Sequence, residues 1–147
     1  MSYLLRDGRF TDEHTPANFI TVDQLQQLKS GTHLALDLPN DANLSEIADR
    51  LAELAVIRIA FPSFADGRGF SLARRLRQIG FAGTLRARGH LIPDQYPHAI
   101  RAGFDEIELD DDVAARQQES HWRDNLAAVT VSYQDRLQRP AIHPRSQ

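Results

Sequence analysis

The segment 62–71 holds the residue types that bind anions most readily. Within it, Arg68 stands between Gly67 and Gly69, immediately before an apolar pattern with helical spacing. Glycine lets backbone N–H groups approach an anion, and the first turn of a helix favours negative charge. The segment is therefore either an anion-binding loop with Arg68 as its cation or a tight turn that needs glycines. It matches neither a P-loop nor a dinucleotide fingerprint.

A second group of polar side chains alternates along an apolar run. Arg86, Arg88 and His90 would share one face of a strand that extends to His90. Because a buried parallel strand is usually apolar on both faces, three interpretations stay open. The strand lies at an exposed edge, its arginines pair with acids such as Asp37, or they line a site. His90 and Asp94 could also form a general base and its orienting carboxylate, and a loop histidine without a role is the alternative.

Strand-length apolar runs alternate with helical patterns along most of the chain. The runs cover 34–38, 56–61, 83–88 and 105–109. Helices are expected over 44–54, over 70–79, around Ile100, and in a long segment that begins after Asp112 and runs at least to Leu126. Gly80 and Gly103 should each end a helix in left-handed conformation, and the phenylalanine after each should enter the core. Thr21 and Gln24 predict a capping box that opens a short helix ending at Gly31.

These elements predict an α/β fold with about four mainly parallel strands. Residues 3–10 should add an N-terminal β-hairpin around an Asp-Gly turn. An open sheet and a sheet curved like half of a (βα)8 barrel both remain open. Residues 1–139 would form a single domain, and the polar, proline-containing segment 140–147 would be a flexible tail.

In either architecture, ligands gather at the carboxyl ends of the strands. We expect Arg68, Arg88 and His90 to converge there on one anion-binding pocket, with Asp66 and Asp94 at its rim. The rival interpretation is that these acids pair with the arginines and neutralise them. The full set of candidate anion-binding residues is Ser63, Asp66, Arg68, Arg88, His90, Asp94 and Gln95.

Composition narrows the function classes. The 147 residues include no cysteine, which excludes disulfides, thiolate metal sites and cysteine nucleophiles. A net charge of −3 with mixed signs argues against nucleic-acid binding. No apolar stretch is long enough for a membrane span and no signal peptide is visible, so a cytoplasmic location is expected. The histidines lack metal-like spacing, and we expect no metal and no cofactor.

The segment 61–77, Phe-Pro-Ser-Phe-Ala-Asp-Gly-Arg-Gly-Phe-Ser-Leu-Ala-Arg-Arg-Leu-Arg, resembles the signature of a bacterial family catalogued as domain of unknown function 934. Segments 85–87, 91–95, 103–106 and 133–134 also fit that family's pattern. Its members are commonly encoded beside assimilatory sulfite or nitrite reductase and are often labelled probable oxidoreductases. The resemblance therefore implies a role in sulfur assimilation, and it brings no established active site. Nothing in the residues supports the oxidoreductase label.

Three functions follow from these observations. The first is an accessory protein of sulfite or nitrite reduction that binds the reductase or a small oxyanion. The second is a small enzyme that acts on an anionic substrate at the strand-end loops, and whether the chain is an enzyme stays open. The third is a structural or assembly module. Under any of the three, the oligomeric state stays open and a homo-oligomer is one alternative.

Overall fold

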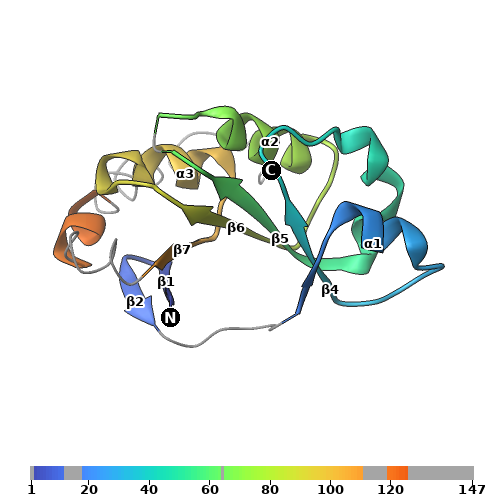
Figure 1. Ribbon diagram of the computed structural model, residues 1–147. Coiled ribbons are helices and arrows are strands. Elements are labelled where there is room, and N and C mark those ends of the chain that lie inside the picture. Colours follow the sequence, from blue (N-terminus) through green and yellow to red (C-terminus); the bar gives the residue numbers. More distant parts are fainter. Residues whose placement is uncertain (1, 12–17, 64, 111–118, 126–147) are drawn as a thin grey trace, which may run out of the picture.

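The protein is an α/β structure built on one open, seven-stranded mixed sheet (Figure 1). The computed structural model describes residues 2–11, 18–63, 65–110 and 119–125. The strand order is β2-β1-β7-β6-β5-β4-β3. The strands are β1 (Ser2–Arg6), β2 (Arg9–Thr11), β3 (Phe19–Ile20), β4 (Leu34–Leu38), β5 (Leu54–Phe61), β6 (Thr84–Gly89) and β7 (Glu106–Asp110). Strands β3 to β7 run parallel, whereas β1 pairs antiparallel with both β7 and β2.

The expectation of four strands is only partly right. The four apolar runs form β4 to β7 and are parallel neighbours in sequence order. The hairpin also forms, because Asp7 and Gly8 both adopt positive φ (54° and 77°), as a tight two-residue turn requires. It joins the same sheet through β1, however, and the two-residue strand β3 was not expected.

The helices are α1 (Val22–Gln27), α2 (Arg68–Gln78) and α3 (Tyr96–Ala102), with short 3-10 turns η1 (Leu44–Glu46), η2 (Ala48–Glu53) and η3 (Pro93–Gln95). The expected helix over 44–54 is therefore wrong, because Ile47 breaks the helical backbone at φ −126° and separates η1 from η2. The capping box at Thr21 is present, but α1 ends at Gln27 rather than at Gly31. Arg50 donates to the carbonyl oxygens of Leu25 and Leu28 at that end.

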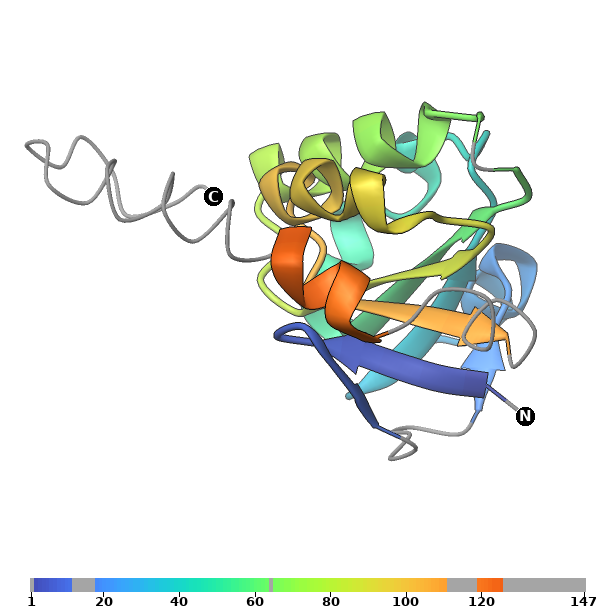
Figure 2. The ribbon, with the colours of Figure 1, turned by 90° about the vertical axis from the view of Figure 1, so that its left-hand side faces the viewer.

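Helices α2 and α3 lie over one face of the sheet (Figure 2). Consecutive parallel strands that are also neighbours need right-handed crossovers, which place every connection on the same side. The hydrophobic core fills this interface, with Ile57, Ile59 and Phe61 of β5 buried against the helices. The opposite face is called here the second face. It carries charged side chains of the central strands, among them Arg58, Arg86 and Glu108.

Two glycines end helices as the sequence predicts. Gly80 has φ +105° and Gly103 has φ +115°. The N–H of Phe81 donates to the Leu76 carbonyl at 3.0 Å, and the N–H of Phe104 donates to the Ala99 carbonyl at 3.0 Å. Both phenylalanines are buried in the core. The same helix-to-strand junction is thus used twice.

Residues 119–125 are helical and hold the hairpin in place. Trp122 is fully buried, and its ring meets Tyr96 edge-on with centroids 5.7 Å apart. The Tyr96 hydroxyl accepts from the N–H of Gly8 at 3.1 Å, and a Glu119 carboxylate oxygen accepts from the N–H of Phe10 at 2.7 Å. The remainder of the expected long helix, Tyr133 and the segment 140–147 lie outside the described residues. No described helix is long and apolar enough to cross a membrane.

Candidate functional site

The loops after β5 and β6 lie side by side, as the strand-end rule predicts. Phe61 pairs with Gly89 in the parallel register. The N–H of His90 donates to the Phe61 carbonyl at 2.9 Å. The candidate residues on these two loops therefore come from neighbouring strand ends, but their side chains form separate groups.

Asp66 and Arg68 form a closed pair at the start of α2. The Arg68 guanidinium donates to the Asp66 carboxylate from Nε at 3.1 Å and from Nη2 at 2.8 Å. The same carboxylate accepts from the Arg68 backbone N–H at 3.1 Å and from Asn40 Nδ2 at 2.8 Å. The side-chain hydrogen bonds from Arg68 hold the pKa of Asp66 well below its usual range. Asp66 thus occupies the helix start that an external anion would use.

Of the two glycines around Arg68, Gly69 serves the packing of α2 against β5. Gly67 has an ordinary φ of −88°. A Cβ at Gly69 would lie 2.4 Å from the Phe61 ring, so only glycine lets the helix approach this closely. Ser63 accepts from the N–H of Ala65 at 3.2 Å and shapes the preceding turn. These contacts favour the tight-turn interpretation of the segment.

Arg86 lies on the second face and is 1% exposed. Its Nε donates to Glu106 Oε1 at 2.9 Å, and its Nη1 donates to Glu108 Oε1 at 3.0 Å. Because β6 lies between β7 and β5, the exposed-edge interpretation is wrong for this strand. Pairing with acids is right for Arg86, which binds Glu106 and Glu108.

The pair extends into a network of alternating charges, called here the second-face network. Arg6 also binds Glu106, and Arg58 binds Asp37 at 2.6 and 2.7 Å. The network consists of Arg6, Arg58, Arg86, Arg88, Asp37, Glu106 and Glu108. Burial acts to raise the pKa of Glu108, but the charges and hydrogen bonds of the arginines outweigh it and lower that pKa. The ring of Phe19 lies 3.8 Å from the Arg58 guanidinium carbon.

Arg88 is the exposed end of this network. Its side chain is 51% exposed, and its Nε lies 3.2 Å from Glu108 Oε2. Strand β6 ends at Gly89, whose φ of +127° interrupts the alternation before His90. Arg86 and Arg88 therefore share a face as expected, and His90 leaves the strand. Within the described part of the chain, no hydrogen bond or ion pair joins Arg68 to Arg88 or His90.

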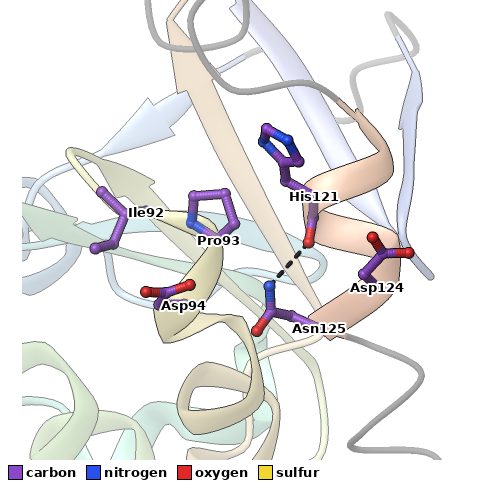
Figure 3. A pocket seen from close by; sticks show the side chains of 6 residues that line it. All are labelled: Ile92, Pro93, Asp94, His121, Asp124 and Asn125. Carbon is purple, nitrogen blue, oxygen red and sulfur yellow. Dashed lines mark hydrogen bonds between the residues drawn. The ribbon is translucent and has the colours of Figure 1, made fainter.

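Asp94 lines a shallow pocket of 310 Å³ between η3 and the helical residues 119–125 (Figure 3). Gln95, beside it, accepts from the N–H of Ile92 at 3.0 Å. The pocket lining is Ile92, Pro93, Asp94, His121, Asp124 and Asn125. Two carboxylates among these six residues suit a cationic group better than an oxyanion. No group of three or more metal-binding side chains forms among the described residues.

Sequence reasoning missed a cluster of basic side chains on the helices. The imidazole of His98 in α3 stacks on the Phe70 ring of α2, with centroids 4.1 Å apart and planes within 11°. Partial burial lowers the pKa of His98, and the charges of Arg74 and Arg101 lower it further. We call Arg74, His98 and Arg101 the basic helical face. The signal available in the sequence was that neither helix contains an acidic residue.

Fold and site define a class: a mixed α/β sheet protein with helices α2 and α3 on one face and an ion-pair network on the other. Residues 35–143 match the family model described as bacterial protein of unknown function (DUF934). This match covers well over half of the chain, and the protein therefore belongs to that family, as its motifs suggested. No curated protein matches the chain.

Proposed function

We propose that the protein is a cytoplasmic accessory protein of assimilatory sulfite or nitrite reduction that acts by binding the reductase. The family resemblance supports the choice of reductase. The observation that carries the binding role is the basic helical face. Arg74 and Arg101 place positive charge beside His98 on two helices without acids, in a chain whose net charge is −3.

The strand-end groups favour a binding role over catalysis. An enzyme that uses general acid–base chemistry needs a titratable group free to reach its substrate. Asp66 is instead held by Arg68 and Asn40. Glu108 is held by Arg58, Arg86 and Arg88. Both carboxylates are therefore engaged in hydrogen bonds and ion pairs within the described part of the protein, which leaves them poorly placed to act as acid or base on a substrate.

The test is co-purification from the bacterial source. A chromosomally tagged protein, expressed in cells that assimilate sulfate or nitrate, should bring down the reductase in amounts well above those from an untagged strain. A high-salt wash should release it, because salt screens exposed charges. Purified protein that carries bound flavin, or that turns over a nicotinamide cofactor alone, would contradict the proposal.

A small oxyanion is the second candidate ligand, and one observation favours it. The second-face network holds Arg6, Arg58, Arg86 and Arg88 against Asp37, Glu106 and Glu108, so the arginines outnumber the carboxylates in it. Sulfite, sulfate or nitrite at about 100 times its Kd should then stabilise the protein by about 2.7 kcal/mol. Arg88→Gln should remove this gain and Lys29→Gln should keep it. A melting temperature of the parent protein that does not change when these anions are added would contradict this second candidate ligand.

A further inference from the structure

The exposed side of the α2–α3 layer brings positive groups from two helices together. Arg74 lies one turn after Phe70 in α2, and Arg101 lies one turn after His98 in α3. The stacked rings of Phe70 and His98 join these two turns. The positive charges of both guanidinium groups act on the His98 imidazole, so the two arginines and the histidine occupy one region of the surface. Ion pairs described for α2 use Arg68 and Arg77 instead.

From this arrangement we infer that the basic helical face docks an acidic surface of a partner protein, and that docking takes up a proton at His98. The inference rests on the proposed function, in which the partner is the reductase. Beyond that function, it specifies the docking surface, the acidic character of the partner surface and the pH dependence of the complex. Carboxylates opposite Arg74 and Arg101 would supply the negative charge that α2 and α3 lack.

Two other occupants fit the surface less well. Nucleic-acid binders carry a basic stripe and a high isoelectric point, whereas this chain has a pI of about 6.0 and the cluster holds two arginines and one histidine. A second copy in a two-fold dimer would place the same patch on both sides of the interface. Arg74 would then face Arg74 or Arg101 of its twin, and like charges opposite one another weaken binding.

The surroundings of His98 are the reason to expect that docking favours its protonated form. In the free protein, partial burial and the charges of Arg74 and Arg101 oppose protonation of its ring. Partner carboxylates would favour the imidazolium instead, because an opposite charge nearby stabilises the charged form. Docking should therefore tighten as pH falls. The nearest acid before His98 in the sequence, Asp94, lines the pocket of Figure 3.

The first experiment reverses charge on the surface. Affinity of the purified protein is measured for the purified reductase and for poly-glutamate as a plain acidic probe. The variant Arg74→Glu/Arg101→Glu should weaken both at least about tenfold. The control Arg9→Glu/Lys29→Glu makes the same change in net charge at exposed positions outside α2 and α3 and should have little effect. Circular dichroism and melting confirm that both variants fold.

The second experiment varies pH from about 7.5 to 5.5, which spans the ordinary histidine pKa. Parent protein should bind the reductase more tightly at the lower pH, by up to about tenfold if docking raises the pKa of His98 by one unit. His98→Gln should lose this part of the pH dependence. His33→Gln, at an exposed histidine outside the cluster, should keep it.

The outcomes separate the inference from the proposed function. Equal binding of the reductase by parent and Arg74→Glu/Arg101→Glu overturns the docking surface and leaves the accessory role intact. Binding of poly-glutamate without any binding of the reductase overturns the accessory role and leaves an acid-binding surface. A pH profile unchanged by His98→Gln overturns the proton coupling. Tighter binding of an oligonucleotide, or self-association through this face, overturns the acidic-protein partner.

Discussion

Arg86 and Glu106 form an ion pair with 2.9 Å between Nε and Oε1, and each side chain is only 1% exposed. The pair joins two neighbouring parallel strands on the face of the sheet opposite α2 and α3. Removing one partner of such a buried pair leaves an uncompensated charge, which is far more costly than the pair is stabilising. Removal of either residue should therefore destabilise the sheet where β6 and β7 pair.

Glu106→Gln should lower the free energy of unfolding by about 3 kcal/mol, because Arg86 and Arg6 both lose a charged partner. Urea unfolding measures this directly. Arg123→Gln is the control, since it breaks an exposed pair with Glu119 and should cost less than about 1 kcal/mol. Equal effects of the two substitutions would show that burial of the Arg86 pair does not matter.

Alanine at three of the glycines with positive φ should destabilise the protein in a definite order. Gly89→Ala should be the worst, because its φ is +127° and a Cβ would lie 2.2 Å from the Phe61 carbonyl oxygen. Gly103→Ala should follow, since its Cβ would press on Arg77 Cγ at 2.7 Å. Gly80→Ala meets nothing within 4 Å and should cost only about 1–2 kcal/mol of backbone strain. Thermal unfolding of the three variants gives the order, and Gly80→Ala as the least stable would contradict it.

Arg68→Ala should raise the pKa of Asp66 toward its ordinary value, because Arg68 is the main cause of the lowered pKa. Carboxyl NMR titration of the parent and the variant measures this change. In the parent, the lowered pKa means that Asp66 adds stability above the unfolded-state pKa of about 3.9 and loses it as pH falls further. Arg101→Ala should leave the titration of Asp66 unchanged, and a shift there as well would point to a general charge effect.

His98 should titrate below the ordinary histidine pKa of about 6.5. Because the unfolded chain then binds the proton more readily, this histidine favours folding above that pH and opposes it as pH falls through the unfolded-state pKa. Arg74→Gln should raise the pKa of His98, because one of the nearby charges disappears. Imidazole NMR titration checks both statements. An unchanged His98 titration in Arg74→Gln would remove Arg74 from the basic helical face.

The local sequence predicts elements whose signal is contained within a few residues. The Asp7-Gly8 turn and the left-handed Gly80 and Gly103 follow from the backbone demands of single positions. The helix expected over 44–54 fails because its apolar spacing fits two short 3-10 turns as well, and the break at Ile47 decides between them. Strand β3 has only two residues, too few for a recognisable alternation.

The site depends on contacts that local patterns do not contain. Asp66 and Arg68 are two residues apart, and their mutual neutralisation was one of the alternatives that the sequence left open. Arg86 and Glu106 are twenty residues apart, and only the strand register makes them partners. The basic helical face likewise requires α2 and α3 to be neighbours, which the stacking of Phe70 and His98 establishes.

Sedimentation velocity of the purified protein mixed with the purified reductase tests the central claim most directly. At low ionic strength and concentrations of tens of micromolar, the account predicts a faster boundary that contains both proteins. That boundary should dissociate at about 0.5 M salt, where the Debye length falls below about 5 Å. It should persist with Arg9→Glu/Lys29→Glu and disappear with Arg74→Glu/Arg101→Glu. Two independent boundaries for the parent protein at low salt would contradict the account.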